Sequence, residues 1–202
     1  HGPIDLVIGA FGPPASVGRA YRAATAAFDG LLDSLVAVLP RLRQPTGDAD
    51  GLPPTARLMH AATAPFADRF VTPMAAVAGA VADTVLAAIR TTPGIERAYV
   101  NNRGDIAVHL TPGQAIDIGV VPELRRPLAT AALRLRHGQG IGGVATSGWD
   151  GRSFSLGIAD AVTVLAASAA DADAAATLIA NAVDLDHAAI ERAPARSLDP
   201  DS

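Results

Sequence analysis

Apolar residues recur at helical spacing in the first half of the chain. Ser16 follows a Gly-Pro-Pro break and is typical of a helix N-cap. From there we expect one long helix that ends at Pro40, because these apolar positions share one side: Ala20, Ala23, Ala24, Ala27, Phe28, Leu31, Leu32, Leu35 and Val36. The same spacing predicts a short helix over 55–67. It also predicts a helix over 74–89, which is apolar nearly all round and therefore buried.

After the turn at Pro93 and Gly94 the pattern changes to that of strands. Short apolar or alternating segments predict strands over 98–100, 105–110, 115–120, 128–135, 144–146, 153–156 and 162–166. A strand over 4–8 precedes the helices, and an alanine-rich helix over 169–183 follows the last strand. This order predicts an α+β fold, with a largely antiparallel sheet covered by helices. We expect one domain over 1–183 and a loosely held tail over 184–202.

Composition narrows the function classes. The chain has 202 residues, half of them apolar, which is ample for a core. Its net charge of −4 argues against a nucleic-acid partner. The absence of cysteine excludes disulfides and thiolate chemistry, and all 16 basic residues are arginine. Schiff-base chemistry and a phosphate-binding lysine are therefore excluded.

No targeting or membrane segment is evident in the sequence. The longest apolar stretch, 73–82, is far shorter than the roughly 20 residues of a membrane span. No basic region precedes the apolar run 6–11, so no signal peptide is visible. We therefore expect a cytoplasmic protein without a membrane partner, whose first residue, His1, is consistent with trimming. A homodimer is compatible with the buried helices, although no stretch requires one.

The segment 101–105 combines small polar residues with a carboxylate. Its two adjacent asparagines, the second of them Asn102, tolerate left-handed backbone conformations, and Gly104 gives a ligand access to the main chain. Arg103 and Asp105 would then present donors and acceptors to a polar ligand. A tight hairpin turn between two strands explains the same residues.

The segment 145–153 places two hydroxyls before a glycine and an arginine four positions beyond it. Trp149 offers a flat face on which a planar ring would stack, or it covers the core of a hairpin. No histidine spacing identifies a base for Ser147 as a nucleophile. The remaining groups suit an oxygen-rich ligand such as a phosphate: Thr146, Ser147, Gly148 and Arg152.

On the last predicted helix, Asp173 and Thr177 lie one turn apart on the same face. One carboxylate and one hydroxyl suit Mg²⁺, which keeps several waters and shares substrate phosphates. The alternative is that Asp171 or Asp173 caps the N-terminus of this helix, where the helix dipole favours negative charge.

These segments resemble motifs of the ApbE-like flavin transferases. Residues 162–166 and 172–177 are similar to the S-V-T-V strand and the A-D-A-L-x-T helix of those proteins. Residues 145–148 match their A-T-S-G, and 101–105 resemble their N-x-G-G-D with Arg103 in place of the first glycine. Residues 72–83 are similar to their D-L-G-A-I-A-K-G-Y-A-V-D.

The chain is identified more closely as a member of an uncharacterised sister family in the same superfamily. Members of that family contain sequence motifs close to H-G-P-I-D-L, T-P-M-A-A-V-A-G-A-V-A-D and Y-V-N-N-G-G-D-I-A, followed by A-T-S-G-W-G-R-S-F-S-L-G-I-A-D-A-V-T-V-L-A. The resemblance covers the chain from His1 to about Arg196. It implies an ApbE-like fold, with FAD or FMN as a ligand and Mg²⁺ as a cofactor.

What the resemblance implies for the site is carried over residue by residue. The metal ligands of the transferases correspond to Asp173, Thr177 and a backbone carbonyl near Ala75. Mg²⁺ in that position would bridge the phosphates of the ligand and act as a Lewis acid. The two loops that line the dinucleotide site correspond to Gly104, Asp105, Thr146, Ser147 and Gly148.

Two departures bear on the chemistry. The lysine of the transferases' A-K-G is Ala78, and their H-x-I-D-P-x-T-G segment is replaced by residues 154–160. Flavin transfer to a protein threonine would therefore lack recognised parts. Asp160 would serve as a base whose pKa is tuned by burial, or would only satisfy nearby backbone amides.

Three functions are compatible with these residues. The first is a metal-dependent, transferase-like enzyme that acts on a flavin, a nucleotide or another phosphate-bearing heteroaromatic ligand with altered chemistry. The second is a binding module that keeps the pocket and has lost catalysis. The third is a hydrolase of a small cyclic substrate, with Asp160 as the base and with Ser147, Arg152 and Arg103 in contact with the substrate.

Overall fold

A five-stranded antiparallel sheet forms the centre of the protein. The computed structural model describes residues 4–120, 131–149, 155–194 and 197. The sheet order is β1-β2-β3-β6-β7, from the strands β1 (Leu6–Phe11), β2 (Arg97–Asn102), β3 (Asp105–Leu110), β6 (Gly143–Ser147) and β7 (Val162–Ala166). The strands β4 (Ala115–Val120) and β5 (Ala131–Arg136) pair as a separate antiparallel ribbon. The predicted α+β fold with an antiparallel sheet is therefore confirmed.

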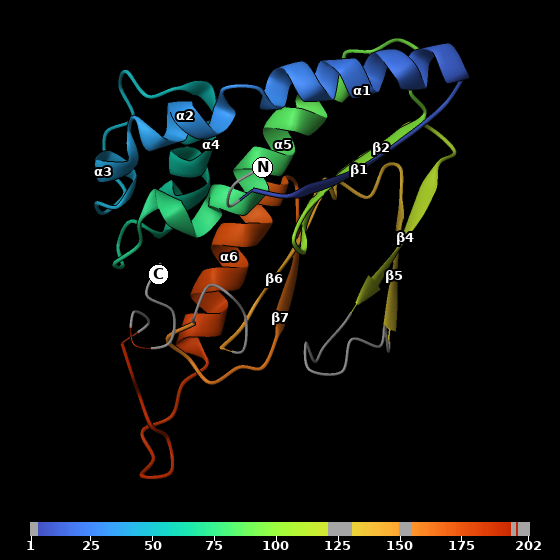
Figure 1. The fold of residues 1–202 in the computed structure, drawn as a ribbon. Coiled ribbons are helices and arrows are strands. Elements are labelled where there is room, and N and C mark those ends of the chain that lie inside the picture. The colour runs from blue at the N-terminus through green and yellow to red at the C-terminus, as the bar shows by residue number, and fades with distance from the viewer. Residues whose placement is uncertain (1–3, 121–130, 150–154, 195–196, 198–202) are drawn as a thin grey trace.

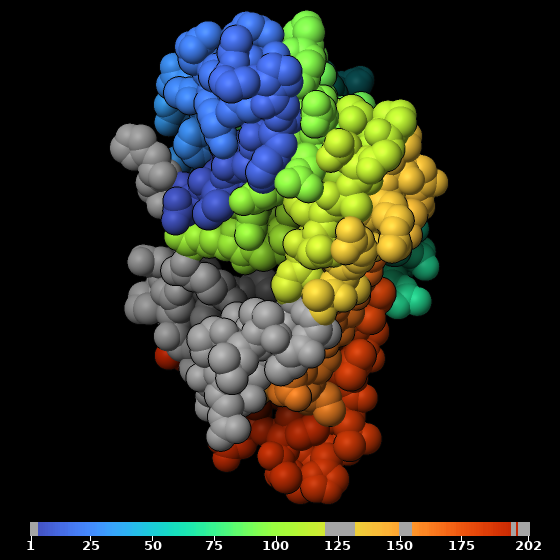
Figure 2. All heavy atoms as spheres, turned by 90° about the vertical axis from the view of Figure 1, so that its right-hand side faces the viewer, coloured from blue at the N-terminus to red at the C-terminus, as the bar shows by residue number. Residues whose placement is uncertain are grey.

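Helices cover one face of the sheet, and the β4–β5 ribbon lies on the other side (Figure 1). Seen from the ribbon side, the N-terminal segments and the C-terminal segments lie at opposite ends of the molecule (Figure 2). The helices are α1 (Pro14–Phe28), α2 (Leu31–Val36), α3 (Leu39–Leu42), α4 (Pro54–Thr63), α5 (Val77–Arg90) and α6 (Ala169–Ala182). Two 3₁₀ turns, η1 (Ala64–Phe66) and η2 (Pro73–Ala76), follow α4 and precede α5.

Helix α5 is the centre of the core. It packs against α1, α4, α6 and the strands β2 and β3, which explains why it is apolar nearly all round. The segment Pro73–Arg90 is long and apolar enough to cross a membrane by composition, with a mean hydropathy of 1.4, and half of it is buried inside the protein. Burial between the sheet and the other helices is the structural reason for this composition.

The predicted helix from Ser16 to Pro40 is wrong in its extent. Gly30, with a φ of 68°, adopts a left-handed conformation and separates α1 from α2. The N-cap position of α1 is occupied by Pro13, whose side chain makes no capping hydrogen bond, and Ser16 lies inside the helix. Pro40 occupies the second position of α3, where the lack of an N–H group costs nothing.

One predicted strand is also wrong. Of the segment 153–156, residues 153 and 154 lie outside the described residues, and Ser155 and Leu156 are not in a strand. The Asn181 side chain of α6 accepts hydrogen bonds from Ser155 Oγ at 3.0 Å and from Leu156 N at 2.8 Å. Helix α6 therefore holds this segment in place of a neighbouring strand. The predicted strand over 128–135 is described from residue 131 onward, as β5.

Helices α5 and α6 approach each other at a glycine. A Cβ atom at Gly79 would lie 2.2 Å from the Ala169 carbonyl oxygen and 2.7 Å from Ala170 N. Both atoms belong to the backbone, so a side chain here would force the two helices apart. The glycine therefore sets the distance between α5 and α6.

We expect Gly79→Ala to lower the free energy of unfolding by roughly 2–3 kcal/mol, because the helices must separate. The matched control is Gly18→Ala in α1, where a Cβ would meet only the end of Arg22 at 3.8 Å. That change should raise stability by about 0.5–1 kcal/mol through the helix preference of alanine. Urea unfolding measures both values; equal stability of the two variants would contradict the close helix contact.

Candidate functional site

Two carboxylates that are far apart in the sequence lie together on the helix side of the sheet. Asp105 is the first residue of β3, on the same face as the buried Ala107, and the backbone N–H of Thr146 in β6 donates to its carboxylate. Asp173 lies on α6, close enough for its negative charge to act on Asp105. The β2–β3 hairpin, β6 and α6 thus meet at this pair.

Asp173 also caps a neighbouring helix. Its Oδ2 accepts a hydrogen bond of 3.0 Å from the backbone N–H of Gly79, in the first turn of α5. In return, the carboxylate of Asp83 on α5 accepts hydrogen bonds from Ala169 N at 3.1 Å and from Ala170 N at 2.8 Å, in the first turn of α6. Each helix therefore supplies the carboxylate that caps the other, which satisfies amides that have no partner within their own helix.

Asp171 lies in the first turn of α6 but is not its N-cap, so the predicted alternative that Asp171 or Asp173 caps this helix is wrong. Ser168 is the N-cap residue of α6, and its Oγ accepts a hydrogen bond from Asp171 N at 3.1 Å and donates to Asp171 Oδ2 at 2.7 Å. Asp173 lies further along the helix and bonds to α5 instead. The two aspartates of α6 consequently have different roles.

Burial dominates the electrostatics of the pair. It raises the pKa of Asp105 to about 8, with a further contribution from the negative charge of Asp173 and an opposing one from the Thr146 N–H. Burial likewise raises the pKa of Asp173 to about 7, against the stabilising N–H groups of Gly79 and Ala78. In the described part of the chain, no arginine or histidine forms an ion pair with either carboxylate. The pair therefore has an excess of negative charge when both groups ionise.

The segment 101–105 is a hairpin turn. Asn102 pairs with Asp105 across the strands, and the two left-handed residues are Arg103, with a φ of 56°, and Gly104, with a φ of 114°. The left-handed residues are those at the two central positions, where a two-residue hairpin requires this conformation, and not the two asparagines that tolerate it. Asn102 Nδ2 donates to the Ala78 carbonyl at 3.1 Å and so ties the hairpin to the start of α5.

The side chain of Arg103 is exposed. A Cβ atom on Gly104 would meet nothing within 4 Å, so the turn leaves open space beside its backbone. The hairpin thus accounts for this segment, and it also brings Asp105 to the carboxylate pair.

The segment after β6 lies next to the loop before β7. Ser147 is 7% exposed, and Trp149, 44% exposed, donates from its Nε1 to Asp160 Oδ1 at 2.8 Å. A Cβ atom at Gly148 would lie 2.2 Å from the Asp160 carbonyl oxygen, so the glycine permits this close contact. Asp160 is itself exposed, and the expectation of a base tuned by burial is therefore wrong. Its carboxylate instead orients the tryptophan.

The remaining candidates are placed as follows. The Thr146 hydroxyl forms a hydrogen bond of 2.9 Å with the Thr163 hydroxyl on the exposed side of β6. The backbone N–H of Thr146 donates to the Asp105 carboxylate. Thr177 is half-buried, one turn beyond Asp173 on the same side of α6. Helix α6 packs against η2, the turn that contains Ala75. Arg152 lies outside the described residues.

Reasoning from the sequence missed Asp83 and the amides of Ala78 and Gly79. Asp83 was visible as a carboxylate within an apolar, buried helix, which is a signal of a specific polar partner. Within residues 4–120, 131–149, 155–194 and 197, no group of three or more His, Asp or Glu side chains is arranged to hold a metal ion. A cation here would rely on two carboxylates together with hydroxyl and carbonyl oxygens.

The fold and the site define a class: an α+β protein with a carboxylate pair where two mutually capped helices meet a β-hairpin. Residues 1–202 match the family model described as "AbpE bacteria". The chain belongs to this family.

Two curated relatives carry the name UPF0280 protein. The UPF0280 protein MK0206 of Methanopyrus kandleri is 40% identical over 149 residues, which are 69% of this chain and 56% of that protein. A UPF0280 protein of Methanothrix thermoacetophila is 38% identical over 122 residues, 60% of this chain and 48% of that protein. The chain thus spans about half the length of the curated relatives it matches.

The raised pKa values predict that part of the stability is lost as the pH rises. Folded Asp105 and Asp173 retain protons above their ordinary pKa near 3.8, so their contribution is complete at low pH and disappears as the pH approaches 8. Asp105→Asn removes one titrating group and its repulsion, and should reduce the loss between pH 5 and 8.5 by on the order of 2 kcal/mol.

The measurement is the free energy of unfolding in urea, compared between variants at each pH. The comparison is needed because burial lowers the pKa of His60, which contributes with the opposite sign. Asp160→Asn removes an exposed carboxylate and is the control. If the stabilities of Asp105→Asn and of Asp160→Asn both follow the wild-type pH profile, then Asp105 and Asp173 do not repel each other in the folded protein.

Proposed function

We propose that this protein binds a phosphate-bearing heteroaromatic ligand, of the flavin or nucleotide type, through a divalent cation such as Mg²⁺. The observation that carries the proposal is the carboxylate pair Asp105 and Asp173, which is half-buried and has no cationic side chain as a partner among the described residues. A divalent cation removes the repulsion between two such carboxylates.

The donor set fits a hard cation. Carboxylate oxygens from Asp105 and Asp173, the Thr177 hydroxyl and a carbonyl of η2 near Ala75 are oxygen ligands, which Mg²⁺ and Mn²⁺ prefer. The Asp173 carboxylate already accepts backbone N–H groups at the start of α5, and a carboxylate has lone pairs that would remain for the cation. Few protein ligands leave positions for water and for phosphate oxygens, as is usual for Mg²⁺.

The protein groups around the pair have separate tasks in this proposal. When bound, the cation supplies Lewis-acid polarisation of a phosphate oxygen. The bond from Asn102 to the Ala78 carbonyl fixes the hairpin against α5 and so positions Asp105. The open space beside Gly104 gives a ligand access to the backbone of the turn. Trp149, oriented by Asp160, offers its exposed ring to a planar group.

A binding module without catalysis is the second candidate function. It is favoured by a specific feature of the chain, since the transferase lysine is replaced by Ala78 and no lysine occurs elsewhere. The carboxylate pair and the two loops are sufficient for binding. The transfer step of the flavin transferases needs groups that the residues of this chain do not match.

Binding of Mg²⁺ and FMN, each alone and together, tests the proposal by isothermal titration calorimetry. We expect FMN to bind tightly only with Mg²⁺ present, and Asp173→Asn to weaken that binding by at least about tenfold through the loss of a charged ligand. Asparagine still accepts the Gly79 amide, so the fold is kept. Asp171→Asn, which removes an exposed charge from the same helix, should change the affinity less than about twofold.

The proposal fails if FMN binding is equal in EDTA and in Mg²⁺, or if Asp173→Asn binds Mg²⁺ as the wild type does. Mass analysis of the incubated FAD or FMN then separates the two candidate functions. Unchanged ligand supports the binding module, and a cleaved or transferred product supports the enzyme.

A further inference from the structure

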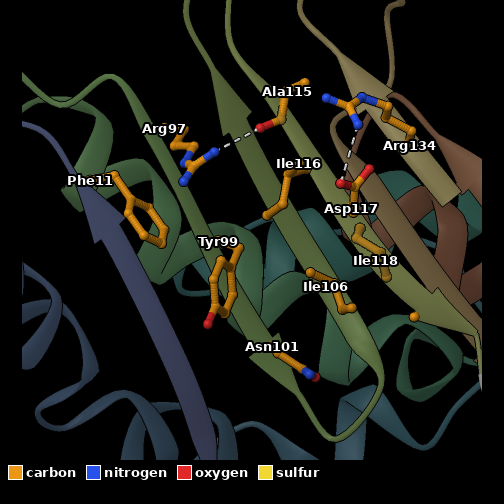
Figure 3. A pocket seen from close by; sticks show the side chains of 11 residues that line it. Phe11, Arg97, Tyr99, Asn101, Ile106, Ala115, Ile116, Asp117, Ile118 and Arg134 are labelled. Carbon is orange, nitrogen blue, oxygen red and sulfur yellow. Dashed lines mark hydrogen bonds and ion pairs between the residues drawn. The ribbon is translucent and has the colours of Figure 1, made fainter. Parts of the chain in front are cut away.

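A cavity lies on the opposite face of the sheet from the carboxylate pair. It has a volume of about 540 Å³, is open to solvent, and is bounded by the outer face of β1, β2 and β3 together with the β4–β5 ribbon (Figure 3). Sites for small organic ligands commonly have volumes of about 300–1,000 Å³. Asn101 and Ile106, which pair across the hairpin, line this cavity, whereas the next pair, Asn102 and Asp105, faces the helices.

The floor of the cavity is polar along one strand. Arg97, Tyr99 and Asn101 alternate along β2 and direct three hydrogen-bonding side chains to the same side (Figure 3). Tyr99 lies over Gly9 of β1, where a Cβ atom would be 2.3 Å from Tyr99 Cε1. Glycine at this position lets the tyrosine ring lie on the sheet, so that the space above it stays open.

Arg97 is held in place but keeps donors for a ligand. Its guanidinium carbon lies 4.3 Å from the centre of the Phe11 ring, and its Nη1 donates to the Ala115 carbonyl at 3.1 Å. An arginine side chain has five N–H donors, so most remain after this bond. Asn101 Oδ1 accepts the Gly104 amide at 2.7 Å, which leaves its NH₂ group to donate.

The charge balance favours an anion. Asp117 and Arg134 form an ion pair at 3.4 Å at the rim and largely neutralise each other. Among the described residues, no carboxylate pairs with Arg97. The positive charge inside the cavity is therefore left for a ligand, and the fixed guanidinium suits the planar geometry of a carboxylate or a phosphate.

The remaining wall is apolar. Ile116 and Ile118 of β4 lie across the cavity from β2, and Ile106 of β3 lies beside the polar floor (Figure 3). An apolar wall opposite a few converging donors is typical of sites for small organic ligands, in which burial of the ligand body supplies affinity and the polar groups fix its orientation.

We propose that this cavity binds an amphipathic organic anion, whose carboxylate or phosphate is held by Arg97 and Asn101 and whose apolar, planar body packs between Tyr99 and the isoleucines of the ribbon. The inference is independent of the cation site, because the sheet separates the two. It is tested without any divalent cation.

The test uses the full chain in EDTA, with calorimetry for affinity and backbone NMR for position. The probes are 2-naphthoate, 2-naphthyl phosphate and the neutral 2-naphthamide. We expect saturable binding of at least one anion, with shifts confined to β2, β3 and β4, and at least about tenfold weaker binding of the amide. Comparison of the two anions shows whether the site prefers a carboxylate or a phosphate.

Arg97→Met keeps the contact with Phe11 and should weaken binding of the anion at least about tenfold. Arg97→Gln keeps a hydrogen-bond donor without the charge and should weaken binding of the anion by a similar factor. With two variants, the result does not depend on whether one of them folds correctly. The matched control is Arg22→Met, an exposed arginine of α1, which should leave the affinity unchanged within about twofold. Equal binding of naphthoate and naphthamide, no saturable binding of either anion at millimolar concentration, or wild-type affinity in both Arg97 variants would overturn the proposal.

Discussion

The antiparallel contact of α5 and α6 is the constraint on which the rest of the structure depends. Each helix donates first-turn amides to a carboxylate of the other, Gly79 to Asp173 and Ala169 and Ala170 to Asp83. The two exchanges fix the register along the helix axes, and the glycine fixes the separation. A shift of one helix by a single turn would leave both carboxylates and several amides buried without partners, at a cost of a few kcal/mol.

This register also creates the candidate site. Asp173 reaches α5 only because α6 lies so close, and in that position it is next to Asp105 at the start of β3. The bond from Asn102 to the Ala78 carbonyl brings the hairpin to the same helix end. A structural cap and a repulsive carboxylate pair therefore share one side chain. Such an arrangement places negative charge where the helix dipole stabilises it, and among the described residues no cationic side chain pairs with it.

Local signals in the sequence predicted much of the fold. The strands β4 and β7 have the predicted bounds, because alternation and β-branched residues define them without reference to distant partners. The break at Gly30 was missed, because a single glycine inside an apolar helical pattern does not show that the backbone becomes left-handed there. Asp173 and Asp105 were candidates from their motifs, but their pairing joins residues far apart in the chain. For the same reason the sequence does not show which amides Asp83 and Asp173 cap, nor the cavity beneath the ribbon.

The central claim is that Asp105 and Asp173 are a mutually repelling pair inside the protein. Carbon-detected NMR of the two carboxyl groups, titrated from pH 3 to pH 10 with and without Mg²⁺, measures this directly. Both groups should titrate well above the ordinary range of aspartate in the absence of the cation, with the curve of each dependent on the other, and both should move to lower pH when Mg²⁺ is added. Independent titration of both near pH 4, unaffected by Mg²⁺, would contradict the claim.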